Sequence, residues 1–548
     1  MKHAKLSSAL VSISLLLVLI ALAVGHTRLT KNPPVIEKLS PAAALPEETL
    51  TITGRNFGDE RGIGDVDVAG IRITSTHYQK WSDEEIQIEV PDGVKSGRVY
   101  VTTSQGKSNG ALFTNKTHIP VVLSGAERPG FPTIEEISPE KGALGEEVTI
   151  SGSNFGQRRA EGKVYFRFLQ EASGAGKDKG GVQEYTACSE LDYDYLHWSD
   201  EEIVVYIPDG AVSGNVTVET DRGKSNEFFF EVEKPDGAKR LEDKRGYQIQ
   251  HEVEITHTSS IDEGESLEFW VPRLTFGYTQ QDIEESHSPD PMWKDYKGVM
   301  RYNIDSGKEG EETLLTHTYW FDRYSISTDI EAESVSDSYD RSRKLFEHYT
   351  EADPFIPADS ELLREMGRRI TGGEASPYKK AEAIYGYLVD NMEEDSSFSG
   401  TLEEALETGV GGASDFGLLF VTLARTADVP ARPVAGYLVY GDKQAQKHVW
   451  AEFYLPDYGW IPADPALGLG LDNIAAPVDS PVDYYFGNLD NQHITFSRQV
   501  VTIPQVNPNS QTVTHDDPFA LQTVWEEYSG SNKGYRSRWG ELRVIDWW

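Results

Sequence analysis

An internal repeat near the N-terminus is the feature that most constrains how this 548-residue chain can fold. The motif Trp-Ser-Asp-Glu-Glu-Ile occurs at residues 81–86 and again at 198–203. The motif Asn-Phe-Gly occurs at 56–58 and again at 154–156. The first pair is separated by 117 positions and the second by 98. The second copy therefore contains an insertion, which we expect in a Gly- and Lys-rich loop at residues 171–183.

Each copy alternates short β-branched runs with turns rich in Gly, Pro and Asp. This pattern predicts an antiparallel β-sandwich for each copy. The Ser-Pro start, the Asn-Phe-Gly turn and the Trp-Ser-Asp-Glu-Glu-Ile motif together resemble the IPT/TIG immunoglobulin-like family. That resemblance implies spacers or binding modules. In the Asn-Phe-Gly turns we expect the Gly to permit a tight turn and the Phe to pack inside the sandwich, rather than to form a ligand loop.

The stretch from residue 411 to residue 465 contains the candidate catalytic residues. Gly411 and Gly412 precede a predicted apolar helix, which ends before Pro430. Two strand-like runs follow, 447–455 and 460–464, joined by a turn-rich tetrapeptide. If the turn centres near residue 456, His448 and Asp464 become direct cross-strand neighbours. A helix N-terminus that faces a His–Asp pair is typical of a papain-like nucleophilic site.

Four segments between residues 430 and 496 resemble the transglutaminase-like superfamily, and the resemblance covers roughly residues 350–500. They are Pro-Ala-Arg-Pro-Val-Ala-Gly-Tyr (430–437), His-Val-Trp-Ala-Glu (448–452), Gly-Trp-Ile-Pro-Ala-Asp-Pro (459–465) and Tyr-Tyr-Phe-Gly-Asn-Leu-Asp-Asn-Gln-His-Ile-Thr-Phe (484–496). The resemblance implies a papain-like fold with a nucleophilic Cys at the start of the helix. Ala413 stands where that Cys belongs. His448 and Asp464 match the other two members of the triad.

The missing thiol decides what chemistry remains, because an alanine methyl cannot attack a carbonyl. Loss of the nucleophile from a triad costs on the order of 10⁶ in kcat. Ser414 is the alternative nucleophile, but it points about 100° away around the helix, and it could instead cap the helix start. Without a nucleophile, His448 and Asp464 form a hydrogen-bonded pair retained for packing. We predict that Trp450 and Trp460 line a substrate groove.

The composition narrows the possible partners. The formal net charge of −38 would repel phosphates, which argues against nucleic acid. The single cysteine, Cys188, cannot form an intramolecular disulfide. The spacing of Asp59, Asp65 and Asp67 matches no calcium loop. We therefore expect no metal and no cofactor.

The first segment of the sequence resembles an export signal. A basic start precedes a mostly apolar run from Ala9 to Gly25, which reads as a signal peptide or an uncleaved membrane anchor. This predicts an extracytoplasmic protein that is secreted, periplasmic or anchored at the cell surface.

The last segment holds Trp525, Trp539, Trp547 and Trp548. We expect it to pack on the core, with binding of a glycan or an envelope partner as the alternative.

The predicted fold class is multidomain: two all-β immunoglobulin-like sandwiches, then a β-rich layer and an α+β transglutaminase-like core. The expected parts are a signal segment (1–25), sandwiches at 33–116 and 131–233, a linker (234–246), a β-rich region (247–345), the core (350–500) and a C-terminal segment (501–548).

Three functions follow from this organisation. The first is an exported, envelope-associated pseudoenzyme whose cleft binds peptide or protein without covalent turnover. The second is an active peptidase or acyltransferase that uses Ser414 with His448 and Asp464. The third is a structural or adhesive surface protein.

Overall fold

The computed structural model describes residues 32–548 except 45–47, 63, 74–76, 92–93, 95–96, 116–129, 161, 169–184, 234–238, 262–264, 471–477, 516–518 and 530–532. The signal segment and the insertion predicted at 171–183 lie outside the described residues. The chain divides into two compact units, Met1–Ala126 and Glu127–Trp548. Within the described ranges, no helix is long and apolar enough to cross a membrane.

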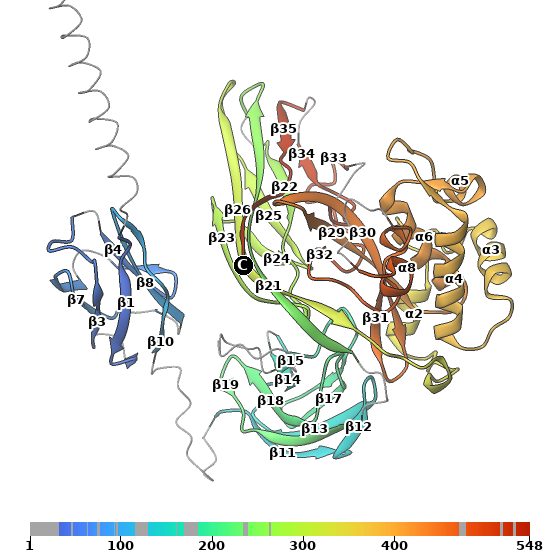
Figure 1. The fold of residues 1–548 in the computed structure, drawn as a ribbon, viewed down its shortest axis with the longest axis horizontal. Helices are drawn as coiled ribbons and strands as arrows, with labels where there is room; N and C mark the ends of the chain where they lie inside the picture. Colours follow the sequence, from blue (N-terminus) through green and yellow to red (C-terminus); the bar gives the residue numbers. More distant parts are fainter. Residues whose placement is uncertain are drawn as a thin grey trace, which may run out of the picture. The chain divides into compact units, whose positions relative to one another are not determined.

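The first unit is a β-sandwich of two sheets (Figure 1). One sheet has the order β1 (Val35–Ser40), β3 (Thr49–Arg55), β7 (Glu85–Glu89) and β6 (Tyr78–Trp81). The other has the order β2 (Ala43–Ala44), β10 (Ala111–Asn115), β8 (Gly97–Thr103), β4 (Asp65–Val68) and β5 (Ile71–Arg72), with β9 (Gly106–Lys107) paired to β8. Alternate residues of β3 point inward, as the period-2 pattern predicts: Leu50 and Ile52 are buried while Thr49 is exposed.

The second sandwich repeats this topology strand for strand. Its sheets have the orders β11 (Thr133–Ser138), β13 (Glu147–Ser153), β17 (Glu202–Tyr206), β16 (Tyr195–Trp198), and β12 (Lys141–Ala143), β20 (Phe228–Glu233), β18 (Gly214–Thr220), β14 (Lys163–Arg167), β15 (Tyr185–Ala187), with β19 (Gly223–Lys224) on β18. The repeated motifs serve the same purpose in both copies. Trp81 Nε1 donates to the Phe57 carbonyl at 3.1 Å, and Trp198 Nε1 donates to the Phe155 carbonyl at 3.0 Å. Both Phe side chains are buried, as predicted.

A layer of long strands follows the second sandwich. One sheet contains β23 (Gln280–Ser288), β26 (Glu312–Ser327), β21 (Arg240–His257), β35 (Tyr535–Trp539) and β36 (Arg543–Trp547). The other has the order β24 (Trp293–Tyr296), β25 (Val299–Ile304), β22 (Leu267–Pro272), β34 (Glu526–Tyr528) and β33 (Gln511–Val513). The C-terminal segment thus supplies strands to both sheets. Trp525 is buried and Trp548 remains exposed.

The linker predicted at 234–246 is shorter than expected. β21 begins at Arg240, which pairs with Ser327 of β26. Leu241 is buried in this strand, whereas Glu242 and Asp243 are exposed. These two charged residues lie at a register shift of β21, between the paired residues Leu241 and Lys244.

The core places a layer of helices on a four-stranded sheet of order β31 (Gly459–Ala463), β30 (Gln444–Leu455), β29 (Ala431–Tyr440) and β32 (His493–Ser497) (Figure 1). The helices are α2 (Lys344–Thr350), α3 (Glu361–Thr371), α4 (Pro377–Asn391), α5 (Leu402–Thr408), α6 (Ala413–Thr426), α7 (Pro465–Gly468) and α8 (Pro481–Tyr484). A short parallel pair, β27 (Glu393–Glu394) and β28 (Val410–Gly411), precedes α6.

Helix α6 lies against β30 at very close range. A Cβ atom built on Gly417 would lie 2.5 Å from the Val449 carbonyl oxygen, so only glycine fits there. Phe416, Leu419 and Phe420 are fully buried on this helix, as the apolar spacing predicts. Behind it, α4 begins with Ser376 as N-cap and Pro377 as the first helical residue. This packing fixes the start of α6 beside the strand that carries His448.

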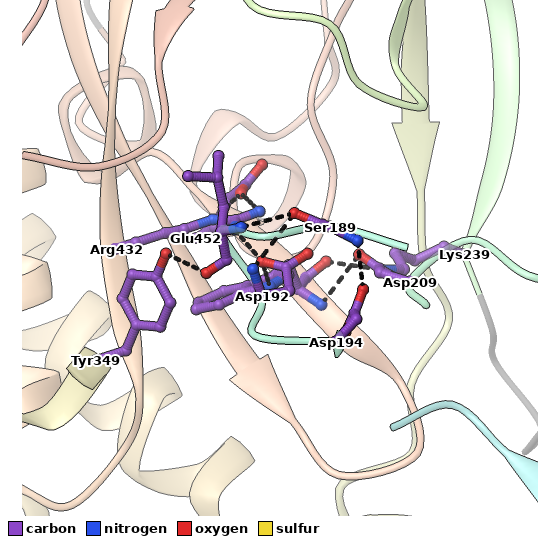
Figure 2. A network of polar contacts seen from close by, with 10 residues as sticks. Ser189, Asp192, Asp194, Asp209, Lys239, Tyr349, Arg432 and Glu452 are labelled. Carbon is purple, nitrogen blue, oxygen red and sulfur yellow. Dashed lines mark hydrogen bonds and ion pairs between the residues drawn. The ribbon is translucent and has the colours of Figure 1, made fainter. Parts of the chain in front are cut away.

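A buried ionic network joins the second sandwich to the core (Figure 2). Arg432 of β29 lies 2.6 Å from Asp192 and 2.7 Å from Glu452, its cross-strand partner on β30. Lys239, just before β21, forms an ion pair with Asp209 and donates to the Trp460 carbonyl at 2.9 Å. The Asp192, Arg432 and Glu452 side chains are 14%, 3% and 8% exposed. The second sandwich is therefore part of the support for the sheet, not a separate spacer.

Candidate functional site

The N-terminus of α6 presents Ala413 where a nucleophile would stand. Gly412 is the N-cap residue, with extended backbone, and Ala413 is the first residue of the helix. Asp415 Oδ2 accepts a hydrogen bond from Gly412 N at 2.8 Å. Ala413 is partly exposed and packs at the edge of the hydrophobic core. Its methyl group supplies no nucleophile and no hydrogen bond.

Ser414 does not take the capping role that the sequence suggested. The N-cap of α6 makes no side-chain hydrogen bond, and Asp415 reaches back to the helix start instead. Within the part of the chain that the structure describes, no hydrogen bond joins the Ser414 hydroxyl to His448. The structure gives Ser414 no base and therefore no activation as a nucleophile.

His448 and Asp464 are brought together as expected. His448 lies on β30, and Asp464 follows β31 directly as the N-cap of α7. His448 Nε2 lies 2.6 Å from Asp464 Oδ2, and Asp464 Oδ1 accepts from Leu467 N at 3.0 Å. Both residues are buried, with His448 only 2% exposed.

The predicted strand register is wrong by a small shift. Ala451 pairs with Ala463, so Asp464 lies one residue past the last pair and is not directly opposite His448. The turn centres at Asp457 rather than residue 456, because Leu455 pairs with Gly459. Asp457 has a φ of 65° in this turn. The Asp464 side chain reaches His448 from the end of the strand.

His493 is a third member of the cluster that sequence reasoning missed. It lies on β32, and its Nε2 is 3.0 Å from Asp464 Oδ2. Its Nδ1 is 2.8 Å from Asp490 Oδ1. The Tyr485 hydroxyl donates to Asp490 Oδ2 at 2.7 Å. The spacing Asp-x-x-His at 490–493 is visible in the sequence, but its link to Asp464 depends on the sheet order.

Electrostatics holds this cluster in a defined charge state. Burial alone would raise the pKa of Asp464, but the charges and hydrogen bonds of His448 and His493 lower that pKa far below its ordinary value. Burial opposes protonation of His493, yet Asp490 and Asp464 raise the pKa of His493 to about 9. The pKa of Asp490 is lowered against its burial by His493 and Tyr485. At pH 7 two buried carboxylates thus surround a charged imidazole.

The prediction that Trp450 and Trp460 line a substrate groove is wrong. They are 1% and 0% exposed. The Trp450 ring packs edge-on against His493, with ring centres 4.9 Å apart. The Trp460 ring lies under Arg432, and its Nε1 donates to Asp192 at 2.9 Å. The second sandwich and the neighbouring strands cover the surface that the sequence alone would have left open.

An open groove lies elsewhere, between the second sandwich and the core. Its volume is about 480 Å³. The polar and aromatic residues that line it are Glu146, Glu147, Tyr206, Ser338, Tyr339, Asp340, Arg343, Phe346, Tyr454 and Asp457. The Arg343 guanidinium lies 3.9 Å from the centre of the Tyr206 ring. With four carboxylates and one arginine in its lining, the groove favours a positively charged ligand.

Comparison with known proteins identifies the domains. Residues 364–465 match the model of the transglutaminase-like superfamily. The chain contains a transglutaminase-like core domain. The matched range includes Ala413, His448 and Asp464, whereas His493 lies beyond it. Residues 34–118 and 132–232 match the IPT/TIG domain, so the two sandwiches are IPT/TIG domains.

Individual relatives match only parts of this chain. An uncharacterised protein from Haemophilus influenzae is 29% identical over 244 residues, covering 36% of this chain and 63% of that protein. The uncharacterised protein YebA from Bacillus subtilis is 26% identical over 151 residues, covering 23% of this chain and 20% of YebA. The chain thus spans less than two thirds of each of these two relatives.

Among solved structures, a candidate cysteine protease from Cytophaga hutchinsonii is similar over 56% of this chain and 93% of that chain, with 13% identity and a TM-score of 0.38.

Proposed function

We propose that this protein is an exported, envelope-associated pseudoenzyme whose transglutaminase-like core binds peptide or protein without covalent turnover. One observation carries the proposal: Ala413 occupies the helix start while His448 and Asp464 stay hydrogen bonded at 2.6 Å. A general base and its orienting carboxylate are present, but the group they would activate is absent.

Ligand binding fits the acidic groove between the second IPT/TIG domain and the core. Its volume of about 480 Å³ falls in the usual range for ligand sites, roughly 300–1,000 Å³. Glu146, Glu147, Asp340 and Asp457 make its lining negative. A peptide segment that contains Lys or Arg is therefore the ligand class that the groove supports.

A structural or adhesive role is the second candidate, and burial favours it. His448 is 2% exposed, and neither Trp450 nor Trp460 offers a ligand-binding face. In that case the transglutaminase-like domain would serve as a folded block docked on the second IPT/TIG domain. The peptidase alternative through Ser414 has no supporting contact in the described part of the chain.

The extracytoplasmic location remains part of this proposal. It rests on the basic and apolar N-terminal segment at residues 1–25. The strongly acidic surface implied by a net charge of −38 fits a well-hydrated exterior.

The test compares the purified protein with its Ala413→Cys variant. Dimethylcasein serves as the acyl donor and monodansylcadaverine as the primary amine that accepts the acyl group, and intact-mass spectrometry detects covalent adducts. We expect no adduct and no amine incorporation with the unmodified protein. An acyl adduct on the unmodified protein that disappears in Ser414→Ala would overturn the pseudoenzyme proposal in favour of the peptidase or acyltransferase.

A further inference from the structure

Three side chains from three separate segments of the core converge on one point. His448, Asp464 and His493 each offer one possible ligand atom, and these three atoms all lie within 4.8 Å of one another. Asp464 Oδ2 lies 2.6 Å from His448 Nε2 and 3.0 Å from His493 Nε2. His448 comes from β30, Asp464 from the end of β31 and His493 from β32. Two imidazoles and one carboxylate are the donor set of the facial triad that binds first-row transition metals.

The surroundings of these groups match those of a metal site. A metal-bound histidine usually donates its other ring nitrogen to a carboxylate, which fixes its tautomer and its orientation. His493 Nδ1 is paired in this way with Asp490 at 2.8 Å. Asp490 is held in turn by the Tyr485 hydroxyl and by Gln492 N, both within hydrogen-bonding distance. Asp464 uses its second oxygen to accept from Leu467 N.

Charge balance also favours a cation at this point. Asp464 and Asp490 are 0% and 5% exposed, and both are carboxylates in a site walled by aromatic rings. Two buried negative charges require compensation. One divalent cation between neutral imidazoles supplies it completely. In the metal-free protein, an extra proton on His493, whose two ring nitrogens face Asp464 and Asp490, supplies part of this compensation.

Two polar aromatic atoms near the cluster have no hydrogen-bond partner in the described part of the chain. They are Trp450 Nε1 and the Tyr385 hydroxyl, both on buried residues. The Trp450 ring packs against both His448 and His493. Burial and, after it, the negative charge of Asp464 raise the pKa of the Tyr385 hydroxyl. Such donors can hydrogen bond a water molecule that completes the coordination of a metal with three protein ligands.

We propose that His448, Asp464 and His493 bind a first-row divalent transition-metal ion, with Asp490 orienting His493. Imidazole ligands select such ions over Mg²⁺ and Ca²⁺, which prefer oxygen. Ala413 supplies no thiol for His448 and Asp464 to activate. Binding a metal ion is a role for these two residues and His493 that needs no thiol. This proposal goes beyond peptide binding and does not depend on it.

The test uses the whole protein after removal of metal with a chelator. Zn²⁺ is added, and metal bound per chain is measured together with the thermal midpoint of unfolding. Co²⁺ serves as a spectroscopic probe, because its visible absorption reports nitrogen and oxygen coordination. We expect one equivalent of Zn²⁺, a raised midpoint and a Co²⁺ band, with no effect of Mg²⁺ at the same concentration.

Two variants separate this site from adventitious binding by exposed histidines. His493→Gln should lose the Co²⁺ band and the Zn²⁺-dependent rise in midpoint. Asp490→Asn retains the ligands but weakens the orienting contact, so its affinity for Zn²⁺ should fall by about 10- to 100-fold. His197→Gln, on the exposed face of β16, is the control and should match the unmodified protein.

Two results would overturn the proposal. The first is a midpoint that Zn²⁺ leaves unchanged, with no bound metal. The second is an unaltered Co²⁺ band in His493→Gln. Either result would mean that protons and hydrogen bonds alone hold the cluster together. The pseudoenzyme proposal would be untouched, because its own test measures adducts and amine transfer.

Discussion

Asp192 Oδ1 lies 2.6 Å from Arg432 Nη1, although the two residues are 240 positions apart in the chain. Asp192 belongs to the second IPT/TIG domain, and Arg432 belongs to the strand beside the one that carries His448. Asp192 also accepts from Trp460 Nε1 at 2.9 Å. One carboxylate therefore satisfies two donors of the core at once.

Replacing this carboxylate should destabilise the whole unit. Among the described residues, Asp192→Ala removes one of the two carboxylates paired with the buried Arg432 guanidinium, and it removes the acceptor of Trp460 Nε1. We expect a loss of about 3 kcal/mol in the free energy of unfolding, measured by urea denaturation. The control is Asp428→Ala, which breaks an exposed pair with Arg341 and should cost less than about 1 kcal/mol. Equal effects of the two variants would show that the second IPT/TIG domain does not support the core.

Two glycines in neighbouring helices should respond in opposite directions to the same change. Gly417→Ala places a methyl group 2.5 Å from the Val449 carbonyl and must push α6 away from β30. We expect a loss of about 1–3 kcal/mol. Gly386→Ala in α4 meets nothing within 4 Å and should stabilise the protein by about 0.5–1 kcal/mol. Thermal unfolding of the two variants measures both effects, and a stabilising Gly417→Ala would contradict the close packing of α6 on β30.

Some of this arrangement could be predicted from local sequence. The start of α6, the burial of Phe416 and the pairing of two strands around residues 456–459 all follow from short-range patterns. The fold class is confirmed for the same reason, since each sandwich carries its own alternation and turns. His493 was missed because its link to Asp464 spans 29 positions and depends on β32 pairing with β29.

Two further predictions, the exposure of Trp460 and the strand register, were wrong for different reasons. The exposure of Trp460 could not be read from its strand, because the residues that cover it come from another domain. The register prediction for His448 and Asp464 failed because the backbone at Asp457 and Gly459 adopts φ of 65° and 74°, which moves the centre of the turn.

The cluster around His493 predicts a specific dependence of stability on pH in metal-free protein. The pKa of His493 is raised to about 9 in the folded state, whereas an unfolded histidine titrates near 6.5. The resulting stability is fully present below about pH 6.5 and is lost as pH rises through 9. The difference corresponds to at most about 3 kcal/mol. Asp464 and Asp490 have lowered pKa values, so their contribution is present above about pH 4 and is lost as pH falls.

Urea denaturation between pH 5.5 and 9.5, with a chelator present, measures this loss. His493→Gln should flatten the decline above pH 6.5, because glutamine has no proton to release. Arg538→Gln, at an exposed pair with Glu254, is the control and should decline like the unmodified protein. An identical decline in His493→Gln would assign the pH dependence to other groups.

The central claim is that this site lacks only the sulfur atom of a nucleophile. The most direct measurement is the pH dependence of alkylation by iodoacetamide of Ala413→Cys, with Cys188→Ser as background so that one thiol remains. We expect a thiol pKa well below the ordinary value of about 8.5, because of the helix N-terminus and His448, and a return toward that ordinary value when His448→Ala is added. An ordinary thiol pKa that His448→Ala leaves unchanged would contradict the claim.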